Sequence, residues 1–309
     1  MSEQSRSQTV SSRIQGVLPV FSTPFHPDES IDFETLAKEI QWIYDQGSDG
    51  IVMAMVSETM RLSQPERRQL AEAACRYGRE RGVVIISVGA ESSHTAVEYA
   101  QHAQASGADA VMAIPPVSAA VAEDELKRYY DRIIEAIDIP VIIQDASGYV
   151  GKPMSIALQA ALYNEYPARV LFKPEASPIG PRLTALREAT AGKAPVFEGT
   201  GGIALVDSFR RGVVGTMPGA DLIDGLVALW KALQRGDERR IYQLSLPLAS
   251  IIAIQTSLDA FLTVEKYLFV KRGIFKNTVI RGPVGYTLDE ETRLELDRLF
   301  ELFLAAVHG

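Results

Sequence analysis

Lys173 ends a short apolar run, Arg-Val-Leu-Phe at residues 169–172, and is followed by Pro-Glu. A lysine in this position is expected to leave bulk water, and burial favours its neutral amine, which is a nucleophile for carbonyl carbon. The pattern therefore indicates covalent attack on a carbonyl group. The alternative interpretation is a structural ion pair between Lys173 and Glu175 or Glu198, and position alone does not separate the two.

Further polar residues follow other apolar runs. Ser57 and Glu58 can hold a carboxylate with a hydroxyl and backbone N–H groups, or they form a turn with an exposed glutamate. Gln144 and Asp145 end the fifth run, where the glutamine can hydrogen-bond a substrate oxygen or, alternatively, the side chain satisfies loop backbone. Thr200, before two glycines, opens a helix whose N–H groups can bind an anion, although a plain helix N-cap is the simpler interpretation.

Eight apolar runs, each followed by a longer amphipathic segment, are expected to position these side chains. The runs are rich in Val and Ile and apolar on both faces, as in parallel strands buried between a core and outer helices. They occupy residues 16–21, 50–55, 83–89, 110–115, 140–144, 169–173, 195–199 and 212–217. Eight such units predict an α/β fold, a (β/α)₈ TIM barrel. An open doubly wound sheet is the alternative, disfavoured because no GxGxxG segment follows the first run.

The chain extends beyond the eighth run by more than one closing helix requires. Helical patterns at about 222–234, 237–271 and 288–307 predict a C-terminal helical extension. We therefore expect residues 1–14 to form a flexible tail, 15–222 the barrel and 223–309 the C-terminal helices. Ser63 and Glu66 have the spacing of a capping box at a helix start.

The active site of such a barrel lies at the C-terminal ends of the strands, which selects residues without any motif search. The expected catalytic residues are Lys173, Gln144 and Glu198. The expected substrate-binding residues are Val56, Ser57, Glu58, Asp145, Glu175, Thr200, Met217 and Gly219.

Composition excludes several other classes of function. The net charge is −8, so no basic field is available for nucleic acid or an anionic membrane. No apolar stretch approaches the roughly 20 residues of a membrane span, and the polar first residues do not form a signal peptide. One cysteine and four histidines without ligand spacing indicate no internal disulfide and no metal site. A cytoplasmic location fits these features.

Several segments, in order and at the right spacing, resemble the family of dihydrodipicolinate synthase and N-acetylneuraminate lyase. They are LPVFSTPF (18–25), SETMRLSQPER (57–67), GADAVMAIPP (107–116), LFKPEA (171–176) and GVVGTMPG (212–219). The resemblance implies a barrel whose Schiff-base lysine falls on Lys173. It also implies a homotetramer or dimer and a small-molecule 2-oxo acid as the binding partner.

The departures from that family concern its proton relay. A tyrosine usually ends the fifth strand there, but Gln144 stands in its place, and an amide is not a general acid or base. A relay threonine and a second tyrosine correspond to Met55 and Ser118. A better match is the branch that resembles L-2-keto-3-deoxyarabonate dehydratase. The shared segments are Ser57-Glu58, Gln144-Asp145-Ala146, Phe172-Lys173-Pro174-Glu175 and Glu198-Gly199.

The resemblance implies a class I lyase that dehydrates or cleaves a 2-keto-3-deoxy sugar acid through an iminium ion on Lys173. Glu198 or Glu175 is the candidate acid or base, provided that burial favours its protonated form. No cofactor is required, since the iminium is the electron sink. Two alternatives remain: condensation of pyruvate with an aldehyde, as in 4-hydroxy-tetrahydrodipicolinate synthase, and a catalytically silent barrel that only binds a 2-oxo acid.

Overall fold

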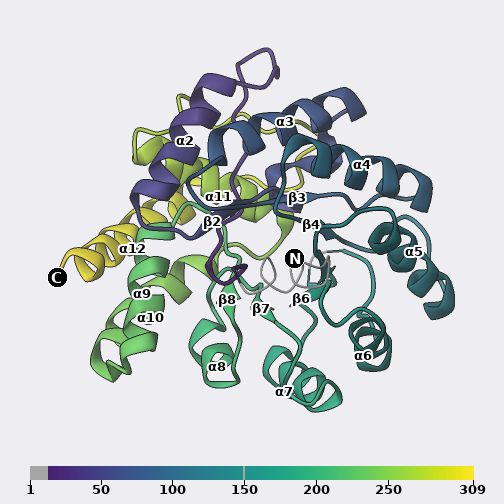
Figure 1. The fold of residues 1–309 in the computed structure, drawn as a ribbon. Coiled ribbons are helices and arrows are strands. Elements are labelled where there is room, and N and C mark those ends of the chain that lie inside the picture. The colour runs from purple at the N-terminus through teal and green to yellow at the C-terminus, as the bar shows by residue number, and fades with distance from the viewer. Residues whose placement is uncertain (1–12, 149) are drawn as a thin grey trace.

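The computed structural model describes residues 13–148 and 150–309, in which β-strands alternate with helices around a ring (Figure 1). The strands are β1 (Gly16–Val17), β2 (Gly50–Val52), β3 (Val83–Ser87), β4 (Ala110–Ala113), β5 (Val141–Asp145), β6 (Val170–Pro174), β7 (Phe197–Glu198) and β8 (Gly215–Thr216). Within the described residues, eight α-helices follow the strands in turn: α2 (Phe33–Asp45), α3 (Gln64–Gly78), α4 (Ser93–Ser106), α5 (Glu123–Glu135), α6 (Ile156–Glu165), α7 (Ile179–Ala189), α8 (Leu205–Arg210) and α9 (Ile223–Arg235). Three more follow: α10 (Glu238–Ile252), α11 (Leu258–Lys271) and α12 (Glu290–His308).

The strands close into a parallel barrel. One set pairs in the order β2-β3-β4-β5-β6 and the other in the order β1-β8-β7. Parallel bridges between Val20 and Val52, and between Phe172 and Val196, join the two sets at both ends. Each of the eight strands in the described residues therefore has two neighbours, so none of them has an exposed edge. The (β/α)₈ barrel predicted from the sequence is confirmed.

Alternation along the strands decides which side chains enter the barrel. In β6, Leu171 belongs to the core inside the ring, whereas Phe172 packs outward against the helices. Successive side chains of a strand point to opposite faces, so Lys173 points inward like Leu171. β5 follows the same rule with Ile142 and Gln144. The two expected catalytic side chains thus project into the same end of the barrel.

The helix signals of the sequence are only partly confirmed. The capping box of Ser63 and Glu66 starts α3 as expected. The single helix expected over 237–271 is wrong, because two helices, α10 and α11, occupy this region. The second one starts at its own N-cap, where the Ser257 hydroxyl accepts a hydrogen bond from the amide of Ala260. The helix expected from residue 201 starts only at Leu205, since two glycines before it adopt positive φ.

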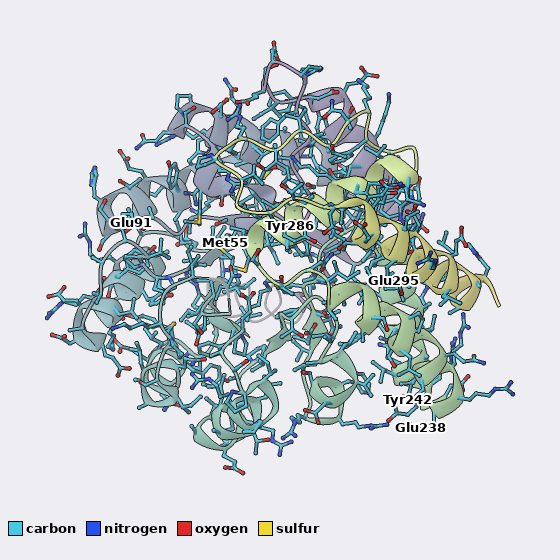
Figure 2. All side chains as sticks on the ribbon, turned by 180° about the vertical axis from the view of Figure 1, so that it is seen from behind. Met55, Glu91, Glu238, Tyr242, Tyr286 and Glu295 are labelled. Carbon is cyan, nitrogen blue, oxygen red and sulfur yellow. The ribbon has the colours of Figure 1, made fainter. Side chains whose placement is uncertain are left out.

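The C-terminal region divides differently from the expected boundary at residues 222 and 223. α9 follows β8 and packs against β1, so it is the eighth helix of the barrel. α10 and α12 pack against α9 and each other, and the ribbon from α11 to residue 289 lies in front of the barrel in Figure 2. Residues 1–12 of the expected tail lie outside the described residues, and Ile14 is buried in the inner core. No helix in the described part of the chain is long and apolar enough to span a membrane.

Candidate active site

The centre of the site is a cluster of three buried side chains from β5 and the end of β6. The Nζ of Lys173 donates to Oε1 of Glu175, and Nε2 of Gln144 donates to the same oxygen at 2.9 Å. The strand register pairs Gln144 directly with Lys173. All three residues are buried, since Lys173 and Glu175 are 4% exposed and Gln144 is 3% exposed. The structural ion pair considered from the sequence thus exists, and it lies inside the candidate site.

One carboxylate oxygen of Glu175 accepts no hydrogen bond from the described residues. Its Oε2 is buried and has no hydrogen-bond partner among the described residues. Burial raises the pKa of Glu175, and this rise is opposed by the Lys173 ammonium and the Gln144 amide, which favour the carboxylate. A buried carboxyl group with a free oxygen beside an amine is suited to accept and return protons.

A pocket opens above this cluster at the C-terminal ends of the strands, where a barrel places its active site. Met55, one of its lining residues, lies near the middle of the ring in Figure 2. The lining residues are Val20, Ala54, Met55, Val56, Gln144, Lys173, Glu175, Gly199, Gly201, Met217, Pro218, Gly219 and Phe261. Six of the residues expected from the sequence are among them: Lys173, Gln144, Glu175, Val56, Met217 and Gly219.

The turn after β2 offers backbone donors to this pocket. Residues Met55–Ser57 form a single 3₁₀ turn, η1, and the amides of Met55 and Val56 have no acceptor among the described residues. The Ser57 hydroxyl is not available, since it donates to the carbonyl of Phe21 at 2.6 Å and accepts from the amide of Ala54 at 3.1 Å. The amides of these two lining residues, and not the expected hydroxyl, are therefore the donors left in this turn for a carboxylate.

Glu58 does not reach the pocket lining either. Its side chain is buried and forms an ion pair with Lys266 of α11. The exposed glutamate considered as the alternative from the sequence is therefore also wrong. Burying two charges is tolerated only when they pair and form further hydrogen bonds.

Glu198 forms a closed unit with two threonines. Its Oε2 accepts from the Thr216 hydroxyl at 2.6 Å, and its Oε1 accepts from both the hydroxyl and the amide of Thr200, the latter at 2.6 Å. The Thr200 oxygen also accepts from the amide of Ala204 at 3.1 Å, which caps the turn before α8. Neither Glu198 nor Thr200 is among the lining residues, and both oxygens of Glu198 are occupied.

Asp145 is turned toward the loop that follows β5. Its two oxygens accept from the amides of Ser147 at 3.2 Å and Met154 at 3.0 Å. Arg182 of α7 lies 3.6 Å from it. This buried carboxylate orders the loop and is absent from the pocket lining.

Sequence reasoning missed the contribution of α11. Phe261 closes one wall of the pocket, and Lys266 lies buried beneath the neighbouring turn. A usable signal was present, because Glu265 and Lys266 interrupt a helix that is otherwise apolar on the same side. Charged residues at buried helix positions are rare unless paired, so they mark a specific contact.

The comparisons with known proteins agree with this geometry. The model of the Dihydrodipicolinate synthetase family matches residues 13–302. The chain belongs to the dihydrodipicolinate synthetase family. It is therefore a lyase of that family, and the resemblance inferred from the sequence motifs is confirmed.

Individual family members are distant but cover nearly the whole chain. L-2-keto-3-deoxyarabonate dehydratase of Azospirillum brasilense is 28% identical over 92% of this chain and 93% of that protein. A putative dihydrodipicolinate synthetase from Pseudomonas aeruginosa superposes with a TM-score of 0.88 at 26% identity, over 94% of this chain and 99% of that one. The dihydrodipicolinate synthase of Acinetobacter baumannii, solved in complex with pyruvate, has a TM-score of 0.84 at 26% identity, over 94% and 99% of the two chains.

Proposed function

We propose that this lyase forms a Schiff base between Lys173 and a 2-oxo acid, and that it dehydrates or cleaves a 2-keto-3-deoxy sugar acid. The observation that carries the proposal is the buried contact of Lys173 with Glu175 inside the pocket. The Acinetobacter baumannii relative, which was solved with pyruvate, supports a 2-oxo acid as the ligand.

Imine formation follows from this contact. Glu175 takes a proton from the Lys173 ammonium, and the free amine attacks the C2 carbonyl carbon to form a carbinolamine. Protonation of its hydroxyl by Glu175 releases water and leaves an iminium ion. The amides of Met55 and Val56 hold the C1 carboxylate while this happens, since they have no acceptor among the described residues.

The next steps separate dehydration from cleavage. In dehydration, Glu175 removes a C3 proton to give the enamine, then protonates the C4 hydroxyl, which leaves as water. In cleavage, Glu175 accepts the proton of the C4 hydroxyl while the C3–C4 bond breaks, giving an aldehyde and the enamine of pyruvate. In cleavage, protonated Glu175 then returns its proton to C3 and converts the enamine into the iminium ion. Water then hydrolyses the iminium ion and returns Lys173 in both cases. The free Oε2 of Glu175 suits either role.

Two observations favour Glu175 over Glu198 as the acid and base. Glu175 touches Lys173 and lines the pocket, whereas both oxygens of Glu198 accept hydrogen bonds from Thr200 and Thr216. Gln144 cannot transfer protons itself, but its amide orients Glu175.

The dehydration or cleavage of a sugar acid is favoured over condensation because Gln144 occupies the place of the family tyrosine. The similarity to L-2-keto-3-deoxyarabonate dehydratase along most of both chains supports the same choice. Gln144→Tyr separates the alternatives: synthase activity that arises only in this variant means that the native enzyme is not a synthase.

The direct experiment is incubation with pyruvate and borohydride, followed by mass spectrometry of peptides. A pyruvyl adduct on Lys173 is expected, and it should disappear in Lys173→Ala. Absence of an adduct, or one that survives the substitution, overturns the mechanism and favours a silent binding barrel. A panel of 2-keto-3-deoxy acids then separates dehydration from cleavage by the products.

The family resemblance also implies a homotetramer or dimer, and the composition favours a cytoplasmic location. Light scattering at several protein concentrations tests the oligomer, and fractionation of the source cells tests the location.

A further inference from the structure

Lys266 lies at the junction of three segments that are far apart in the sequence. Its Nζ donates to the carbonyl of Thr23 at 2.9 Å, to the carbonyl of Val279 at 2.7 Å and to the carboxylate of Glu58. It also lies 4.5 Å from the centre of the Phe25 ring. The residue is 0% exposed, so water does not compete for these contacts. One buried ammonium thus links α11, the segment after β1 and the turn after β2.

Glu58 is the residue through which this link acts on the pocket. It has a φ of 57°, a left-handed conformation that is unfavourable for a residue with a side chain. Its amide donates to the carbonyl of Met55 at 3.0 Å and closes η1, and its carbonyl accepts from the amide of Arg61 at 2.8 Å. The pairing of its side chain with Lys266 therefore holds a strained residue that ends the turn carrying Met55 and Val56.

The same turn is fixed from its other side. Thr23, whose carbonyl accepts from Lys266, donates its hydroxyl to the carbonyl of Ser57 at 2.6 Å. Lys266 therefore holds both Thr23, which donates to Ser57, and Glu58, which follows Ser57 in the chain. In Figure 2, Met55 lies beside the ribbon of α11, and the helix contacts η1 directly.

We propose that Lys266 is a positioning residue, which holds the turn so that the amides of Met55 and Val56 face the substrate carboxylate. This inference rests on the proposed function, since it assumes a 2-oxo acid bound through Lys173. It gives α11, outside the eight barrel units, a direct influence on substrate affinity in addition to the wall that Phe261 provides.

A purely structural ion pair would make a different prediction. Loss of such a pair would weaken all ligands equally or reduce the amount of folded protein. Loss of the positioning role would weaken only ligands that carry the carboxylate. Pyruvate and methyl pyruvate both form an imine with Lys173, but the ester has no anionic carboxylate for the amides to bind. A comparison of the two probes therefore measures how much Lys266 contributes to binding of the carboxylate.

The experiment measures borohydride trapping at increasing concentrations of each probe in the full-length protein. In Lys266→Met, the half-saturating concentration of pyruvate should rise by about 10- to 100-fold, the range for losing hydrogen bonds to a charged group. The half-saturating concentration of methyl pyruvate should change by less than about threefold, and the trapping rate at saturation should stay within about threefold for both probes. Equal weakening of both probes, or no change in either, overturns the proposal.

Two further variants keep the test decisive. Lys266→Met leaves Glu58 charged and buried, so the double variant with Glu58→Gln removes both charges and should show the same selective loss with less risk to folding. Lys271→Met is the matched control, because Lys271 lies on the same helix and pairs with Asp297 at the partly exposed surface. It should leave both probes unchanged. If the unmodified protein forms no adduct, the proposed function fails and this inference with it; an adduct without carboxylate selectivity refutes Lys266 alone.

Discussion

Glu175 and Lys173 lie two residues apart along one chain segment, yet their side chains meet, and Gln144 of the neighbouring strand donates to the same Glu175 oxygen. Lys173 ends the inward face of β6, while Glu175 follows the strand and folds back over it. The residue that replaces the family tyrosine is therefore not itself a proton donor in a relay. It is a hydrogen-bond donor that stabilises the carboxylate beside the nucleophile.

The two glutamates considered as acid or base should respond differently to removal of their charge. Glu175→Gln should lower kcat for the sugar acid by about 10²- to 10⁴-fold, the usual contribution of a general acid and base. Glu198→Gln should lower it by less than about tenfold, but should reduce the free energy of unfolding by about 1–3 kcal/mol because Thr200 and Thr216 lose a charged acceptor. Steady-state kinetics and urea unfolding measure the two effects.

The pyruvate adduct is the control for this comparison. Both variants retain Lys173, so both should still form the adduct, more slowly in Glu175→Gln. A larger loss of kcat in Glu198→Gln than in Glu175→Gln would reverse the assignment.

Gln144→Leu should move the pH dependence of the reaction. The amide of Gln144 favours the ionised form of Glu175, so its removal should raise the pKa of that carboxyl group further. If ionised Glu175 accepts the C3 proton, activity is lost as the pH falls through this pKa, and the acidic limb of kcat should move to higher pH. A profile of kcat between pH 5 and 9 measures the shift. If the acidic limb does not move, a group other than Glu175 controls it.

Much of the site followed from the sequence because strand ends are easy to recognise. Lys173 and Gln144 could be assigned to the barrel interior from their apolar runs, and the structure gives both an inward direction. Glu175 could be selected by position, but its contact with Lys173 depends on how the chain bends after β6. That bend is not encoded in the periodicity of the strand.

Three residues that were expected in the site have side chains engaged elsewhere, and their hydrogen-bond partners could not be predicted from the sequence. The hydroxyl of Ser57 and the carboxylates of Asp145 and Glu198 are each taken up by backbone or side-chain donors from other segments. Such partners follow from register and loop path, which local patterns do not determine. Lys266 was overlooked for the same reason: its partner Glu58 lies 208 positions earlier in the chain.

Asp221 should make the stability of the protein depend on pH. Burial raises the pKa of Asp221 from its ordinary 3.8 to about 6 in the folded state. The folded state therefore keeps this proton where the unfolded chain has lost it, so the contribution to stability falls as the pH rises from about 4 to 6. In Asp221→Asn, which cannot ionise, that loss should be absent.

The measurement for Asp221 is urea unfolding of the native protein and the variant at pH 4, 5, 6 and 7. The free energy of unfolding of the native protein minus that of Asp221→Asn should fall by on the order of 1–3 kcal/mol between pH 4 and 6 and then level off. Asp45→Asn, at the exposed end of α2, controls for the loss of one charge. A difference that rises with pH would show that the folded state favours the ionised form.

Gly219 and Phe261 should behave as a coupled pair in the pocket wall. A Cβ added at Gly219 would overlap the Phe261 ring, whose Cε2 would lie 3.0 Å away. Gly219→Ala should therefore displace the ring and cost about 1–3 kcal/mol of folding free energy, as overpacking of a close-packed site does. Phe261→Leu in the same chain removes the far end of the ring and should recover part of that loss. A double-mutant cycle of urea unfolding should give a coupling free energy above about 0.5 kcal/mol, whereas additive effects would mean that the two residues do not share this space.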